Sequence, residues 1–216
     1  MGSGIWAIFY SLPETGRDDY LSWFHRVHIP EKLSRPGYIW ASHFQSFCRQ
    51  DEGLSEFLAL FGGESTRTFF DPSPKQLKER QDEETRRMID HRVGASSLIY
   101  TVEWQIDGTQ HGEREAMNDP ILWLERFSDT EDPMDLEAWC AQERTRLSGR
   151  LQKCRRSRKL LAASGTPRHA VTFEFSEPNL QETGFPLLQE EGSRESRIPE
   201  GIKRQEAPFL GTRIWP

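Results

Sequence analysis

Apolar and polar residues alternate along the first half of the chain in the order expected for a β-α-β-β-α-β unit. Residues 5–12 alternate with strand periodicity, and residues 19–28 place apolar side chains at helical spacing. Pro30 is expected to end that helix or to open the next turn, because its ring nitrogen has no proton to donate. The same rules predict strands at 38–47, 57–62 and 97–104 and a charged helix at 75–90. Residues 1–106 therefore form the first expected unit.

The pattern begins again after residues 107–119, a polar and turn-rich segment that is typical of a linker. The second expected unit is residues 120–216, with strands at 121–127, 157–163, 168–175 and 212–215 and helices at 134–150 and 187–191. Two tandem ferredoxin-like βαββαβ units give an α+β fold. Their antiparallel sheets are expected to pack face to face into one barrel, with a pocket between the sheets.

The two halves also align by a shift of 116 residues without a gap. This shift places Ile5 on Ile121 and Trp23 on Trp139. The second half keeps the helical tryptophan and loses both histidines of the first helix. The agreement of element order between the two halves favours an internal duplication. Because the second half lacks the two histidines, we expect any site to lie in the first half.

The composition limits the class of protein. The chain has 216 residues, of which 35% are hydrophobic and 29% are charged, and its net charge is −6. This balance is typical of a globular protein and disfavours a general affinity for nucleic acid. The sequence has no apolar run of membrane-spanning length and no signal-peptide pattern, so we expect a cytoplasmic protein without membrane contact. Its three cysteines form no Cys-x-x-Cys pair, which argues against a disulfide framework or a zinc ribbon.

One local charge run departs from this acidic balance. Residues 144–159 contain eight basic side chains and no acidic one. A run of this kind is usually a solvated helix face. The alternative is an anion site for a phosphate, a carboxylate substrate or an acidic partner.

Three histidines are the candidate catalytic residues: His25, His28 and His43. His25 and His28 flank one edge of the apolar stripe of the first helix, where a neutral imidazole can accept or donate a proton near pH 7. Aromatic residues on the neighbouring elements are the expected substrate-binding wall: Trp6, Tyr10, Trp23, Tyr38 and Trp40. Ordinary core packing is the alternative for each of them singly. No carboxylate or cysteine stands in metal-binding spacing with the histidines, so we expect no metal site and no cofactor.

The run W-x4-H-I-P-E-K-L-x2-P-G-Y, from Trp23 to Tyr38, is followed by the apolar strand FLALF at residues 57–61. Together they resemble the EthD-like branch of the dimeric α/β-barrel proteins, over about residues 5–63. The resemblance implies a barrel of that type, a homodimer as one assembly, and a cofactor-independent enzyme of aromatic or polyketide metabolism. His28 is the one site residue that carries over directly.

Three functions from different classes stay open. The first is a cofactor-independent lyase, cyclase, isomerase or oxygenase that acts on an aromatic or polyketide-like ligand in a barrel pocket reaching His28. The second is a non-catalytic small-molecule-binding protein whose histidines are already hydrogen-bonded. The third is a protein-interaction module, which predicts an exposed apolar patch and no pocket.

Overall fold

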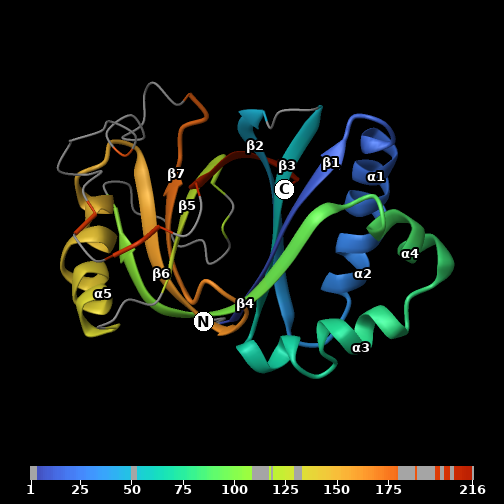
Figure 1. Ribbon diagram of the computed structural model, residues 1–216, viewed down its shortest axis with the longest axis horizontal. Helices are drawn as coiled ribbons and strands as arrows, with labels where there is room; N and C mark the ends of the chain where they lie inside the picture. Colours follow the sequence, from blue (N-terminus) through green and yellow to red (C-terminus); the bar gives the residue numbers. More distant parts are fainter. Residues whose placement is uncertain are drawn as a thin grey trace.

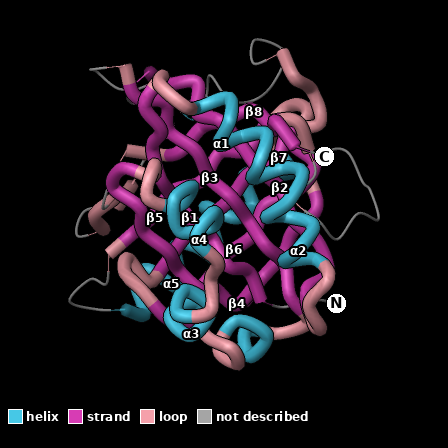
Figure 2. Tube along the Cα trace, turned by 90° about the vertical axis from the view of Figure 1, so that its right-hand side faces the viewer, coloured by secondary structure: helices cyan, strands magenta, loops and turns pink. Residues whose placement is uncertain are grey.

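Within the described residues, eight antiparallel strands close into one barrel in the order β1-β3-β2-β8-β5-β7-β6-β4 (Figure 1). The computed structural model describes residues 4–49, 53–108, 117, 119–128, 133–179, 188, 198–199, 202–204 and 207–215. Each hydrogen-bonded pair of neighbouring strands is antiparallel. The helices lie on the outside of the barrel, with α1 to α4 over the first half and α5 over the second (Figures 1 and 2).

The first half supplies four strands: β1 (Gly4–Pro13), β2 (Tyr38–Arg49), β3 (Leu54–Gly63) and β4 (Val93–Asp107). Between β1 and β2 runs one continuous helical segment, made of α1 (Arg17–Trp23), the π-helical turn η1 (Phe24–His28) and α2 (Ile29–Leu33). Between β3 and β4 lie the 3₁₀ turn η2 (Thr66–Phe69), α3 (Pro74–Glu79) and α4 (Glu83–Ile89).

The second half supplies the other strands: β5 (Ile121–Phe127), β6 (Cys154–Ser164), β7 (His169–Phe175) and β8 (Phe209–Trp215). Its first helix is α5 (Pro133–Trp139), which runs on into the π turn η3 (Cys140–Arg144) and the 3₁₀ turn η4 (Thr145–Gly149). The expected linker at 107–119 and the expected helix at 187–191 lie mostly outside the described residues. No helix in the described ranges is both long and apolar enough to cross a membrane.

Alternation along β1 separates two cores. Ile5, Ala7 and Phe9 point into the barrel, where they pack with apolar side chains from both halves. Trp6 and Tyr10 point outward and pack under the helices of the first half. The barrel interior is thus filled around its middle by buried apolar side chains, and the outer face carries a second, separate core.

One expectation about the helices was confirmed and one was wrong. Pro30 opens the next turn, as expected, because it lies in the first turn of α2, where a missing N–H is tolerated. The charged helix expected at 75–90 is two helices, α3 and α4. The break occurs because Asp82 acts as a second N-cap and accepts a hydrogen bond from the Thr85 N–H at 2.7 Å.

The gapless alignment of the two halves was also wrong at their first strands. Ile5 faces the barrel interior, whereas Ile121 packs in the outer core of the second half. A register difference of one residue turns every side chain of a strand to the opposite face. Trp23 and Trp139, by contrast, both pack in the outer core of their own half.

The basic run at 144–159 is mostly not a solvated helix face. Much of it forms β6, and its cations pair with carboxylates from distant segments. The Arg144 guanidinium lies 2.6 Å from the Glu125 carboxylate, and both side chains are buried. Arg158 pairs with buried Glu174 in the same way. Because a buried charge needs a partner, these pairs leave the paired cations of the run unsuited to an external anion.

Replacing Trp139 with alanine is expected to destabilise the protein by about 3–5 kcal/mol. Trp139 is 5% exposed and packs edge-on against Phe127 with ring centres 5.2 Å apart, so truncation leaves a cavity in the outer core of the second half. The free energy of urea unfolding would measure the loss. Met134→Ala on the same helix is the control, because Met134 is 72% exposed. A loss below about 1 kcal/mol for Trp139→Ala would contradict this packing.

Candidate functional site

A π turn positions the two histidines of the first helix. α1 begins after Gly16, whose φ of 76° suits glycine, and the helix continues into η1. In η1 the Ile29 N–H donates to the Phe24 carbonyl five residues back, which widens the turn. Regular helical spacing would leave His25 and His28 on one edge of the helix. The wider turn separates them, so that His28 is buried at 3% exposure and His25 reaches toward β2.

His25 belongs to a hydrogen-bonded chain with His43 and Tyr10. The Tyr10 hydroxyl lies 2.8 Å from His43 Nε2, and His43 Nδ1 lies 2.8 Å from His25 Nε2. His43 is fully buried, and burial lowers the pKa of its imidazole well below the usual value. Burial also raises the pKa of the Tyr10 phenol. Both groups therefore stay neutral, and both nitrogens of His43 are occupied.

His28 lies apart from this chain, at a cavity outside the barrel. Its imidazole packs against the rings of Trp23 and Phe24, with centres 4.7 and 5.4 Å away. The cavity has a volume of about 250 Å³, is open to solvent on one side, and is lined by residues of β1, the start of β4, the η1–α2 segment, α3 and α4. Trp6 and Leu77 contribute to its apolar wall.

Four buried polar atoms of residues lining this cavity have no hydrogen-bond partner in the described part of the chain: Trp6 Nε1, His28 Nδ1, Gln81 Oε1 and Arg92 Nη2. Lys32 also lines the cavity at 2% exposure, and its Nζ lies 3.9 Å from Glu31 Oε2. Among the described residues that line the cavity, none is an aspartate or a glutamate. Buried polar groups normally find partners, so this concentration indicates a place where a ligand supplies them.

The electrostatics of the cavity follow from burial and from its excess of cations. Burial, with the nearby Lys32, Arg92 and Arg35 cations, lowers the pKa of His28 to about 2. Burial lowers the pKa of Lys32 to about 8, against the opposing effect of Glu31. At neutral pH the imidazole is therefore uncharged, and most Lys32 side chains carry a proton. The cavity combines a neutral base with positive charge.

Arg92 connects the cavity with the hydrogen-bonded chain. Its Nε–H donates to the Tyr20 hydroxyl at 2.6 Å, and its guanidinium lies 4.7 Å from the centre of the Tyr10 ring. These contacts fix the guanidinium against two aromatic rings. The chain of Tyr10, His43 and His25 thus supports the placement of Arg92 and does not itself line the cavity.

The structure divides the expected substrate-binding residues. Trp6 lines the cavity, and Trp23 packs on His28. Tyr38 packs against Phe69 in the outer core, with ring centres 5.2 Å apart. Trp40 packs against the interior core of the barrel. The cavity that reaches His28 therefore lies between helices and sheet, and not between the two sheets as the sequence predicted.

Lys32, Gln81 and Arg92 were missed from sequence. Lys32 follows His28 by one helical turn, and this spacing could have marked it as a neighbour. Gln81 lies between α3 and α4, and Arg92 lies between α4 and β4. No local pattern singles out either one, because only the tertiary fold brings those connections to η1.

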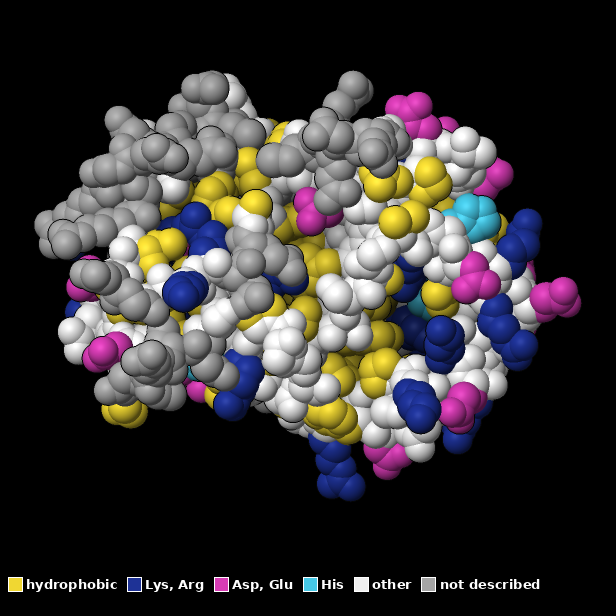
Figure 3. All heavy atoms as spheres, in the orientation of Figure 1, with side chains coloured by type: hydrophobic (Ala, Val, Ile, Leu, Met, Phe, Trp, Pro, Cys, Tyr) yellow, Lys and Arg dark blue, Asp and Glu magenta, His cyan; other side chains and the backbone are white. Residues whose placement is uncertain are grey.

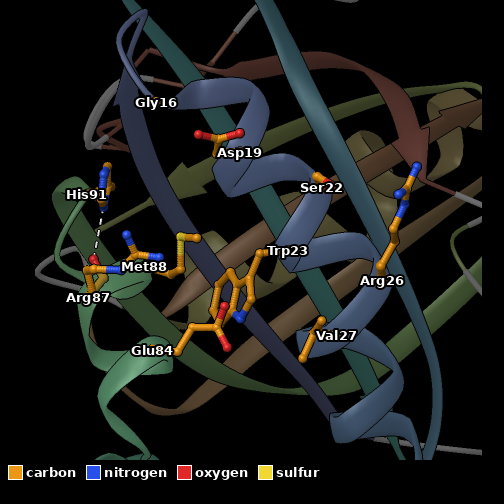
Figure 4. Close-up of a pocket in the computed structure, with 10 residues that line it drawn as sticks. All are labelled: Gly16, Asp19, Ser22, Trp23, Arg26, Val27, Glu84, Arg87, Met88 and His91. Atoms are coloured by element: carbon orange, nitrogen blue, oxygen red, sulfur yellow. Dashed lines mark hydrogen bonds between the residues drawn. The ribbon is translucent and has the colours of Figure 1, made fainter.

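A second hollow lies between α1 and α4 (Figure 4). It has a volume of about 340 Å³, and its charged residues have both signs, including Asp19, Glu84 and Arg87. Trp23 forms part of its wall, and His91 Nδ1 lies 2.9 Å from the Arg87 carbonyl oxygen. Its mixed charges give it no preference for one kind of ion. In the described ranges, no group of three or more His, Cys, Asp and Glu side chains is placed to hold a metal ion.

No protein-family model and no curated protein matches the sequence. Solved structures do match the fold. An anthrone oxidase-like protein has a TM-score of 0.63 at 10% identity, covering 99% of this chain and 91% of its own. A proposed monooxygenase from Fusobacterium nucleatum has a TM-score of 0.60 at 8% identity, covering 98% and 92%. A proposed chlorite dismutase has a TM-score of 0.57 at 13% identity, covering 99% and 96%. These likenesses show the fold alone, a mixed α/β fold around the eight-stranded antiparallel barrel of the described residues.

Proposed function

We propose that this protein is a cofactor-independent enzyme that acts on a small aromatic or polyketide-like substrate in the cavity beside His28. One observation carries the proposal: the His28 Nδ1 atom is buried, has no hydrogen-bond partner in the described part of the chain, and belongs to a residue that lines a cavity with an apolar wall. The fold-level likeness to a proposed monooxygenase and an anthrone oxidase-like protein supports a small-molecule enzyme on this fold.

The reaction begins with a proton transfer. Neutral His28 accepts a proton from an enol, a phenol or a carbon acid; the electron pair of the broken bond stays on the substrate, and an N–H bond forms on the imidazole. Lys32 and Arg92 stabilise the resulting oxyanion through their positive charge in the same cavity, without having to contact it. An imidazole with a pKa of about 2 is a weak base in the empty cavity. An anion beside it raises that pKa, so the imidazolium and the product anion stabilise each other.

An enolate or phenolate is the common intermediate of the reaction types that the sequence suggested. It can lose a leaving group, attack an internal carbonyl, or return the proton at another carbon. In the oxygenase type, dioxygen is the oxidant: one of its oxygen atoms replaces two hydrogens of an activated ring carbon as a carbonyl oxygen, and the other is reduced to water. All of these reaction types share the initial proton transfer, and this is the step assigned to His28.

A duplicated chain is part of the proposal. The strand order is β4-β1-β3-β2 in the first half and β8-β5-β7-β6 in the second, which is the same order. The π turns η1 and η3 begin at Phe24 and Cys140, which differ by the 116 residues of the sequence shift. These features support two ferredoxin-like units at 1–106 and 120–216 joined by 107–119. Membership of the EthD-like branch, a homodimer and a cytoplasmic location stay predictions.

A substrate screen tests the function. The purified protein would be incubated in air, without added metal or organic cofactor, with a panel of small phenols, 1,3-diketones and anthrones. Substrate loss would be followed by mass spectrometry and oxygen use by an electrode. We expect one class to be consumed, with a rate unchanged by a metal chelator. Binding of panel compounds without any consumption would contradict catalysis and favour the non-catalytic binding protein.

A further inference from the structure

We propose that the ligand of this cavity is a small hydroxy-substituted ring acid, whose carboxylate is bound by Lys32, Arg92 and Trp6 and whose hydroxyl faces Gln81 and His28. This inference rests on the proposed function for the site and adds the class of its substrate. Three kinds of observation carry it: the sign of the charge, the number of donors and acceptors, and the size of the cavity.

The positive charge of the cavity favours an anionic ligand. Lys32 and Arg92 both line it, and no aspartate or glutamate does so among the described lining residues. The nearest carboxylate oxygen recorded for Lys32 Nζ is that of Glu31 at 3.9 Å, on a residue that does not line the cavity. A buried cation without a close partner is unfavourable, so a ligand that brings a negative charge gains affinity. On the surface over the helices of the first half, by contrast, acidic and basic side chains are interspersed (Figure 3).

The donors outnumber what a single oxygen atom can accept. The Lys32 ammonium, the Arg92 Nη2 and the Trp6 indole N–H supply at least three donor groups at one cavity. A carboxylate has two oxygens with about four acceptor positions and matches this set. A single phenolate oxygen does not satisfy all of them with good geometry. The donor set therefore favours a carboxylate over an isolated phenolate.

The two remaining unpartnered atoms are of the opposite kind. Gln81 Oε1 accepts hydrogen bonds only, and His28 Nδ1 accepts one in the tautomer that carries its proton on Nε2. Both atoms accept from a donor that the carboxylate does not have. A hydroxyl group on the ring has one proton and donates it to one of the two atoms at a time, and beside His28 this is the proton that the hydroxyl gives up.

The size limits the ring system. A volume of about 250 Å³ lies below the range of roughly 300–1,000 Å³ that is usual for ligand pockets. The apolar wall, with Trp6, Ile8, Leu77 and Ile89, suits the flat face of one or two rings. A compact ring acid fills the cavity, whereas a long polyketide chain does not.

Calorimetric titration at pH 7 with 4-hydroxybenzoate and its neutral analogue 4-hydroxybenzamide tests this inference. We expect the acid to bind at least ten-fold more tightly than the amide. Lys32→Met and Arg92→Gln are each expected to weaken binding of the acid at least ten-fold. Arg87→Gln is the matched control, because Arg87 is an exposed arginine that lines the second hollow, and it should change the Kd less than two-fold.

Several results would overturn the inference: equal affinity for acid and amide, no binding of the acid at millimolar concentration, or loss of binding in Arg87→Gln alone. If Arg92→Gln fails to fold, the affinity of Lys32→Met for the acid tests the inference alone, and an unchanged Kd would overturn it. Tight binding of the acid without any turnover would support the proposed ligand class. The same result would contradict the proposed catalysis.

Discussion

His28→Gln is expected to lower turnover by about 10²–10⁴-fold, the usual contribution of a side chain that transfers a proton. Glutamine has nearly the volume of histidine and keeps hydrogen-bonding atoms, but it cannot accept a proton near pH 7. Because His28 Nδ1 makes no hydrogen bond in the described part of the chain, the change breaks no hydrogen bond at that atom. The rate of substrate consumption, on the compound that the screen identifies, measures the effect.

The matched control is His91→Gln, since His91 lies at the second hollow and not at this cavity. Circular dichroism and urea unfolding would verify that both variants fold. A His28→Gln variant that turns over substrate within three-fold of the original protein would show that His28 is a packing residue of the outer core.

Lys32→Met is expected to raise the free energy of unfolding at pH 7 by about 1–3 kcal/mol, even though it weakens ligand binding. The Lys32 ammonium is buried at 2% exposure, and its pKa falls from 10.5 to about 8. The folded chain therefore holds this proton less tightly than the unfolded chain does. Methionine fills a similar volume without the charge. Site residues often reduce stability in this way.

The pH dependence of this gain follows from the same shift. Below about pH 8 both states of the original protein carry the proton, and the penalty for the buried charge is at its full size. Between about pH 8 and 10.5 the folded chain loses the proton first, so the stability of the original protein rises toward that of the variant. Urea unfolding at pH 7 and pH 10 would measure both values, with the exposed cavity residue Lys78→Met as control. If Lys32→Met lowered the free energy of unfolding by more than about 1 kcal/mol at pH 7, Lys32 would be a residue that stabilises the fold.

Strand alternation was a dependable guide to the fold where both faces of a strand are buried in different cores. β1 is the best example, since its odd residues fill the barrel and its even residues pack under the helices. The expected strand at 5–12 is confirmed as Gly4–Pro13. β6 was harder to interpret, because Arg156 and Arg158 resemble solvent-facing residues until their partners Asp107 and Glu174 are known. Those partners are distant in sequence, and no local pattern indicates the pairing.

The candidate site could be predicted in part. Trp6 and His28 were named from sequence, and both line the cavity. The π turn could not be foreseen, because the apolar spacing of residues 19–28 also fits a regular helix. Without it, the expected geometry grouped His25 with His28. The expected pocket between the sheets followed instead from the face-to-face packing of the two predicted sheets. Arg92 reaches the cavity only because α4 folds back over η1, which is a property of the tertiary structure.

The central claim is that the ligand binds outside the barrel, beside His28. A crystal structure of the protein with 4-hydroxybenzoate is its most direct test. We expect the ring to lie against Trp6, with its carboxylate within hydrogen-bonding distance of Lys32 Nζ and Arg92 Nη2 and its hydroxyl near His28 Nδ1. A ligand bound inside the barrel or in the hollow between α1 and α4, with this cavity left free of it, would contradict the claim.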